Sequence, residues 1–151
     1  MFARQPSVRE VHAFEPNPRL LEQFDRNLRL NPEAAQKVRA HRIALGSAGE
    51  GSLDAQVAAG VPIPDIVKMD VDGPEADILR GAEKILSARR TLWIVETHSA
   101  ALEEEVAGIF RAHGHRSWYP DGPWWLRFFP EQRPHPPNRH LIAQPLSEPK
   151  L

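Results

Sequence analysis

Segments with strand and helix periodicity alternate along most of this chain, and this alternation restricts the fold more than any other feature. Strands are expected at residues 8–14, 38–45, 65–71, 92–97, 116–119 and 140–143. Helices are expected from Pro18 to Asn31, from Pro74 to about residue 87, and over residues 53–59 and 100–112. Alternation of this kind produces a largely parallel sheet with helices on both faces, so we predict an α/β fold.

Length and composition restrict the class of protein. A chain of 151 residues with 41% hydrophobic and 26% charged residues is typical of one globular domain, so we expect a single domain over residues 1–151. A segment rich in proline and aromatic residues, at about residues 120–137, is expected to be an insert in that domain. The chain contains no cysteine, which excludes disulfides, thiol catalysis and cysteine-ligated zinc.

Charge and hydropathy restrict the partners. A formal net charge of −1 creates no long-range field that attracts a polyanion, so nucleic acid is not an expected partner. The longest apolar runs are far shorter than the roughly 20 residues that span a bilayer, and the first residues do not form a signal peptide. We therefore expect a cytoplasmic location, no membrane contact and a small-molecule ligand.

Acidic residues follow the expected strands, at the sheet edge where ligands of α/β proteins bind. Glu15 follows the first strand, and a carboxylate there can accept hydrogen bonds from both hydroxyls of a ribose. An exposed carboxylate before a helix is the simpler interpretation of Glu15 alone. Asn17 and Pro18 then suit the N-cap and the first position of the following helix.

Two further strand ends contain residues that can do chemistry. Asp70, Asp72 and Glu75 can bind a divalent cation, orient an amine or act as a base. Capping of the next helix by Asp72, with Glu75 near the positive end of its dipole, explains them equally well. Glu96 and His98 point the same way on an extended chain and can share one site, although a surface pair is the simpler interpretation.

Taken together, these strand ends resemble the FkbM family of methyltransferases. The strongest match is IVKMDVDGPE at residues 66–75, continued by ILRGA at 78–82. The others are VHAFEPNP at 11–18, NLRLN at 27–31, IALG at 43–46, IVETH at 94–98 and residues 138–145, which resemble the family's last strand. The segments occur in the order of the family and cover nearly the whole chain apart from the insert. Asp72 stands where the family has a longer glutamate.

The resemblance implies a Rossmann-like class I methyltransferase sheet, mostly parallel, with an antiparallel C-terminal strand pair. It implies that S-adenosylmethionine is the cofactor and that its methyl group goes to an oxygen, often on a sugar or secondary metabolite. No residue is assigned as a metal ligand. The implied cofactor-binding residues are Glu15 at the ribose with Asn17 beside it, Ala44 at the adenine and Asp70 at the methionine end. The implied catalytic residues are Asp70, Glu75, Glu96 and His98, with His98 or Asp70 as the base.

The resemblance also predicts that the family's first strand and glycine-rich loop are missing. Counting back about 20 residues from Glu15, the usual spacing from such a loop, passes beyond Met1. Each buried backbone group left unpaired costs about 1–3 kcal/mol. We therefore hypothesise a truncated reading frame or gene remnant, active or inactive.

Two other functions remain open at this point. One is a metal-dependent hydrolase that uses Asp70, Asp72, Glu96 and His98. The other is a non-catalytic chain that folds only with a partner supplying the missing strand, which would make it part of an oligomer.

Overall fold

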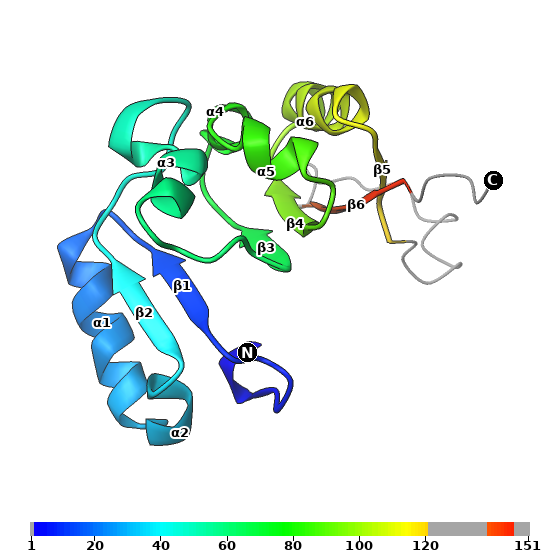
Figure 1. The fold of residues 1–151 in the computed structure, drawn as a ribbon. Helices are drawn as coiled ribbons and strands as arrows, with labels where there is room; N and C mark the ends of the chain where they lie inside the picture. Colours follow the sequence, from blue (N-terminus) through cyan, green and yellow to red (C-terminus); the bar gives the residue numbers. More distant parts are fainter. Residues whose placement is uncertain (1, 121–138, 147–151) are drawn as a thin grey trace, which may run out of the picture. The chain divides into compact units, whose positions relative to one another are not determined.

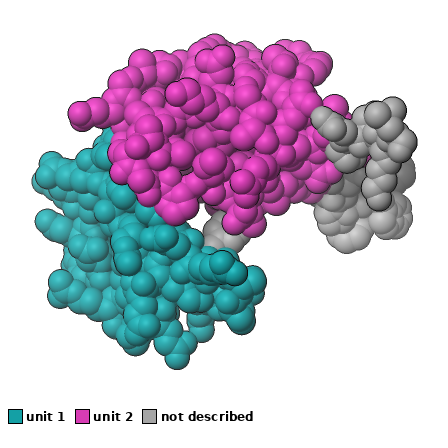
Figure 2. Space-filling model, in the orientation of Figure 1, with its two compact units in different colours: residues 1–45 teal, residues 46–151 magenta. Residues whose placement is uncertain are grey.

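The computed structural model describes residues 2–120 and 139–146. Apart from Pro120, the expected insert at about 120–137 lies outside these residues. The chain divides into two compact units, residues 1–45 and residues 46–151 (Figure 2). We call them the N-terminal unit and the C-terminal unit and describe each by itself.

The N-terminal unit is a parallel strand pair with short helices (Figure 1). Its elements are a 3₁₀ turn η1 (Phe2–Arg4), β1 (Val11–Phe14), α1 (Pro18–Arg29), α2 (Pro32–Ala35) and β2 (Val38–His41). Helix α1 starts where the sequence predicted, because the Asn17 side chain accepts a hydrogen bond from the Arg19 amide at 3.0 Å and Pro18 occupies the first turn. The expected strand 38–45 is shorter, and ends at His41, the residue that pairs with the last residue of β1.

The C-terminal unit contains a four-stranded sheet in the order β3-β4-β6-β5. Its elements are η2 (Gly49–Gly51), α3 (Leu53–Ala58), β3 (Ile66–Met69), α4 (Glu75–Arg80), α5 (Glu83–Ser87), β4 (Leu92–Thr97), α6 (Ala100–Ala112), β5 (His115–Trp118) and β6 (Arg139–Pro145). Strands β3 and β4 are parallel, whereas β6 is antiparallel to both β4 and β5. The predicted α/β fold, with its antiparallel C-terminal strand pair, is confirmed.

The core of this unit lies between the sheet and the helices α4, α5 and α6, which run along one side of it (Figure 1). Alternate residues of β4, among them Trp93 and Val95, are fully buried on that side. Phe110 of α6 is also fully buried, and its ring centroid lies 5.8 Å from that of Trp93. Burial of these apolar side chains stabilises the unit. Because they occupy one face of β4, the opposite face is left for polar residues.

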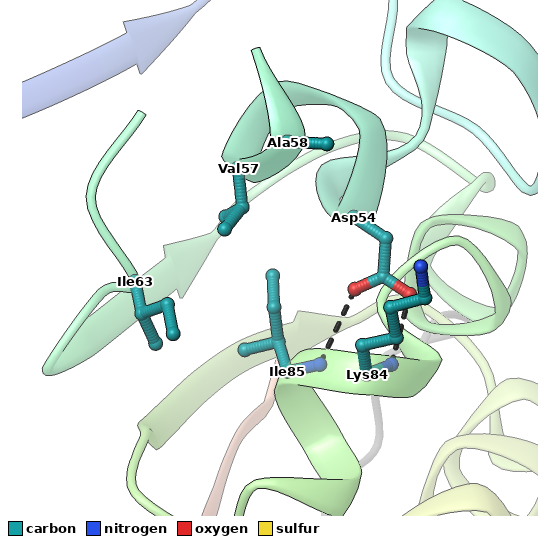
Figure 3. A pocket seen from close by; sticks show the side chains of 6 residues that line it. All are labelled: Asp54, Val57, Ala58, Ile63, Lys84 and Ile85. Atoms are coloured by element: carbon teal, nitrogen blue, oxygen red, sulfur yellow. Dashed lines mark hydrogen bonds between the residues drawn. The ribbon is translucent and has the colours of Figure 1, made fainter. Parts of the chain in front are cut away.

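The sequence predicted one helix after Pro74, and the structure has two, α4 and α5. In a continuous helix the Ile85 amide would donate to the Gly81 carbonyl. Instead, that carbonyl accepts from the Asp54 amide at 2.9 Å. The Asp54 carboxylate in turn accepts from the amides of Lys84 and Ile85, at 2.8 and 3.2 Å (Figure 3). Asp54 therefore replaces the helical bonds at the break and caps the start of α5.

Within residues 2–120 and 139–146, every helix is too short or too polar to cross a membrane.

Candidate active site

In the N-terminal unit, Glu15 and Ala44 follow adjacent parallel strands. The Glu15 amide donates to the His41 carbonyl at 3.0 Å, which extends the pairing of β1 with β2 by one bond. The half-buried Glu15 carboxylate accepts from the Asn17 amide at 2.7 Å, while the Asn17 side chain caps α1. Ala44 is exposed beyond the end of β2. The carboxylate is thus held at a strand end, and the cofactor-binding roles of these residues stay predictions.

Sequence reasoning did not single out two histidines of this strand pair, one on β1 and one on β2. His12 Nδ1 and His41 Nε2 are 2.8 Å apart, and the ring of Phe14 stacks on His41 with centroids 4.6 Å apart. Burial lowers the pKa of His41, and the nearby His12 lowers it further. A hydrogen bond between two imidazoles requires that at least one of them be neutral. His12 and Phe14 are two residues apart in β1, so their side chains share one face of the strand. This spacing is the sequence signal that could have drawn attention to the pair.

In the C-terminal unit, Asp70 and Glu96 lie next to each other, because Met69 pairs with Val95 in the parallel ladder. Lys68 Nζ donates to Asp70 Oδ2 at 2.7 Å. This ammonium group is the main cause that lowers the pKa of Asp70; burial opposes it, and a hydrogen bond with Glu96 adds to it. Asp70 is therefore held ionised at an exposed strand end, beside the more buried Glu96.

Strand β6 brings His140 to the same place. Its register sets His140 opposite Glu96, with Nε2 3.4 Å from Glu96 Oε2. Sequence reasoning assigned His140 no role and did not single out Lys68. The position of His140 follows from the pairing of β6 with β4, which no local motif encodes.

His98 lies between two carboxylates just beyond β4. Its Nε2 is 2.9 Å from the Val71 carbonyl oxygen, 3.5 Å from Glu75 Oε1 and 3.5 Å from Asp72 Oδ1. The Glu75 side chain is completely buried, whereas that of Asp72 is fully exposed. Pro74 is the N-cap of α4, with no side-chain capping bond, so the alternative in which Asp72 caps this helix is wrong.

The structure thus brings the four residues predicted to be catalytic to the carboxyl ends of β3 and β4. They form two pairs, Asp70 with Glu96 and Glu75 with His98. Their side chains can accept a proton, hold a cation or accept hydrogen bonds from a polar ligand. Their catalytic roles stay predictions.

Among the described residues, no three histidine or acidic side chains converge closely enough to hold a metal ion. The metal-dependent hydrolase stays an alternative from the sequence.

An open pocket of about 220 Å³ lies elsewhere in the C-terminal unit (Figure 3). Its lining is mostly apolar and consists of Asp54, Val57, Ala58, Ile63, Lys84 and Ile85. Ile63 precedes β3, whereas Asp70 follows it. The pocket and the acidic residues therefore lie toward opposite ends of this strand.

The sequence profile described as the methyltransferase FkbM domain matches residues 34–118, more than half of the chain. The chain belongs to this family. The matched segment of this FkbM domain includes Asp70, Glu75, Glu96 and His98, and it confirms the resemblance seen in the strand-end motifs. No curated protein matches the chain significantly.

Solved structures share the fold of this FkbM chain. The methyltransferase FkbM from Methylobacillus flagellatus superposes with a TM-score of 0.64 at 16% identity over 89% of this chain and 36% of its own. A precorrin-6Y C5,15-methyltransferase from Geobacter metallireducens superposes with a TM-score of 0.60 at 14% identity, over 91% of this chain and 68% of its own. An S-adenosylmethionine-dependent O-methyltransferase from Thermotoga maritima superposes with a TM-score of 0.57 at 15% identity, over 99% of this chain and 55% of its own. The chain thus spans about a third of the first protein's length, and these likenesses establish a Rossmann-like fold.

Proposed function

We propose that this FkbM chain binds S-adenosylmethionine and serves the transfer of a methyl group to an oxygen of a small molecule, such as a sugar or secondary metabolite. The supporting observation is the grouping of Asp70, Glu96, Glu75 and His98 at the ends of two adjacent parallel strands, the position where α/β folds bind ligands. Family membership supports the reaction class.

The residues present fit the cofactor chemically. Glu15 offers a half-buried carboxylate, already oriented by the Asn17 amide, to the ribose hydroxyls. Ala44, small and exposed, leaves room for the adenine. Asp70, held ionised by Lys68, suits the positively charged methionine end. When bound, S-adenosylmethionine supplies a methyl group on a positively charged sulfur.

The acceptor side requires a group that takes the proton of the hydroxyl. His98 suits this task because an imidazole exchanges protons near neutral pH. Asp70 is the weaker candidate, since the Lys68 ammonium that lowers its pKa also lowers its basicity.

Titration calorimetry with S-adenosylhomocysteine tests the proposal. We expect binding by the wild-type chain and a loss of about tenfold or more in affinity for Glu15→Gln, because a charged hydrogen-bond acceptor is removed. Glu33→Gln, which removes an exposed carboxylate of the same unit away from the strand ends, is the matched control. Heat from Mg²⁺ or Mn²⁺ alone, with none from S-adenosylhomocysteine, would overturn the proposal in favour of a metal-dependent hydrolase.

A second candidate is a chain that folds or binds ligand only together with a partner. Among the described strands, β1 pairs only with β2, and β3 pairs only with β4. An exposed strand edge is a template for another strand. Size-exclusion chromatography with light scattering distinguishes a chain that binds its cofactor alone from one that needs a partner. A stable monomer that binds S-adenosylhomocysteine contradicts this candidate, and a mixed oligomer or an aggregate supports it. The cytoplasmic location stays a prediction from the sequence.

A further inference from the structure

Two rings of the N-terminal unit are joined by a hydrogen bond between their nitrogens. His12 Nδ1 and His41 Nε2 are 2.8 Å apart, and the two ring planes are inclined by only 16°. A hydrogen bond between two imidazole nitrogens contains one hydrogen, so one of these two atoms must lack a hydrogen of its own. The number of protons that the pair can hold is therefore limited by its geometry.

The limit follows from a count of hydrogens. Two separate imidazolium rings carry four ring N–H hydrogens, two on each ring. The joined rings carry at most three, one between them and one on each outer nitrogen, which corresponds to a single positive charge. The fourth hydrogen can be added only if the bond between His12 and His41 breaks, and it leaves two like charges side by side. Uptake of the second proton is thus linked to separation of the rings.

The surroundings favour the first proton and oppose the second. Glu10 Oε1 lies 3.3 Å from the outer nitrogen of His12, Nε2, so a single positive charge has a carboxylate beside it. Arg39 on β2 faces the same carboxylate, with its Nε 3.8 Å from Oε1, and partly offsets it. Within residues 2–45, no group of η1, α1 or α2 makes an ion pair with either ring. At His41, burial and the nearby His12 both lower the pKa.

The pair lies where β1 and β2 end. His41 is the last residue of β2 and pairs in register with Phe14, the last residue of β1, whose ring stacks on it with centroids 4.6 Å apart. One residue further, the Glu15 amide donates to the His41 carbonyl at 3.0 Å. Among residues 2–45 the only buried apolar side chains belong to two alanines, so few packing contacts hold this strand end closed.

We propose that the His12–His41 hydrogen bond is a pH-sensitive switch: uptake of the second proton breaks it, loosens the end of the β1–β2 pair and displaces Glu15. The separated rings bind more protons than the joined rings, so the closed form is favoured above the ordinary histidine pKa of about 6.5 and is lost as the pH falls below it. Once the joined rings hold their single proton, the ratio of closed to open form falls about tenfold per pH unit. An effect on ligand binding rests on the proposed function, in which Glu15 receives the ribose, whereas the switch itself does not.

An NMR titration of the chain from about pH 8 to pH 4.5 follows the Cε1–H signals of both rings and the amide of Glu15. We expect two steps. In the first, the pair gains one charge and the Glu15 amide stays in place; in the second, both rings become charged and the Glu15 amide signal moves with them. The Leu92 amide, which donates to the Asp65 carbonyl in the other unit, should not follow the second step. Two charged rings without any change at Glu15 would overturn the proposal.

His12→Gln tests the hydrogen count. Its amide can donate to a neutral His41 ring and accept from a charged one, so the contact survives at any pH and the Glu15 amide should stay in place while His41 titrates. His113→Gln, which removes a half-buried histidine of the other unit, is the matched control and should behave as the wild type. A Glu15 amide that moves at the same pH in His12→Gln as in the wild type would overturn the proposal.

Glu10→Gln covers the case in which His12→Gln does not fold, because the Glu10 side chain is 40% exposed and its replacement leaves both rings in place. It removes the carboxylate that favours the single proton of the joined rings. The Glu15 amide should therefore begin to move at a pH higher by about 0.2–0.7 than in the wild type. A movement that begins at the same or a lower pH would overturn the proposal.

Titration calorimetry with S-adenosylhomocysteine tests the link to the proposed function. Between pH 7.5 and pH 5 we expect the wild type to lose about tenfold or more in affinity, and His12→Gln to lose clearly less. Equal losses in the two proteins would overturn the link to Glu15. Failure of the wild type to bind at either pH overturns the proposed function instead, and the NMR titration still decides the switch.

Discussion

Gly81 lies at the break between α4 and α5, and its substitution by alanine is a direct test of the packing at this point. A Cβ atom on Gly81 would lie 2.1 Å from the Gly46 carbonyl oxygen and 3.1 Å from Ser52 Cβ. The first distance is far below any normal contact, and the obstructing atom belongs to the backbone. We therefore expect Gly81→Ala to force the two backbone segments apart.

The size of the effect follows from what holds these segments together. The Gly46 amide donates to the Gly51 carbonyl at 2.8 Å, and the Asp54 amide donates to the Gly81 carbonyl at 2.9 Å, so a shift strains both bonds. Overpacking of a buried position costs about 1–3 kcal/mol. Alanine gains no helix propensity here, because Gly81 is the C-cap of α4. A loss of this size lowers Tm by roughly 2–4 °C per kcal/mol in a chain of this length.

Gly108→Ala is the matched control. Gly108 lies inside α6, and a Cβ there meets nothing within 4 Å among the described residues. Its substitution should raise the free energy of unfolding by about 0.5–1 kcal/mol, since alanine restricts the unfolded chain more than glycine does. Urea and thermal unfolding followed by circular dichroism measure both variants. If Gly81→Ala is as stable as the wild type, the close approach to Gly46 is wrong.

Three further outcomes are expected. Asp54→Ala should lower the free energy of unfolding by about 1–2 kcal/mol in urea denaturation, because the amides that start α5 lose their cap; an unchanged midpoint would contradict the capping role. Burial lowers the pKa of His115, so as the pH falls the unfolded chain takes up a proton on this histidine before the folded chain does, and the free energy of unfolding should fall below about pH 6.5. His115→Gln should weaken this dependence between pH 7.5 and 5.5. Equal slopes of unfolding free energy against pH in the variant and the wild type would refute it. His12→Phe should raise the pKa of His41 only part of the way, since burial is the larger cause, and an NMR titration in which it returns fully to the ordinary value would disprove that order.

Local signals predicted the elements that depend on neighbouring residues. The Asn17 cap and Pro18 gave the start of α1, and the apolar run through β3 gave a strand between two acidic residues. Adjacent parallel strands end at the same edge, so the grouping of Asp70 with Glu96 followed from the sequence as well.

Contacts between distant residues were not predictable in this way. The break between α4 and α5 depends on Asp54, 30 residues before the amide of Lys84. The place of His140 depends on the register of β6, which is set by pairing across the sheet and not by its own residues. The full exposure of Asp72 and the burial of Glu75 could not be distinguished in the sequence, where both are acids flanking one turn.

The central place of β6 has a consequence for synthesis on the ribosome. Of the described strands, β6 is translated last, yet it lies between β4 and β5. Trp93 of β4 pairs with Ala143 of β6, which is 50 residues later in the chain. Until that strand has left the exit tunnel, the emerging polypeptide exposes two unsatisfied ladder edges and the apolar side of β4. The sheet of this unit can therefore be completed only after its earlier strands have been translated, and pairing of strands so far apart in the sequence is slow.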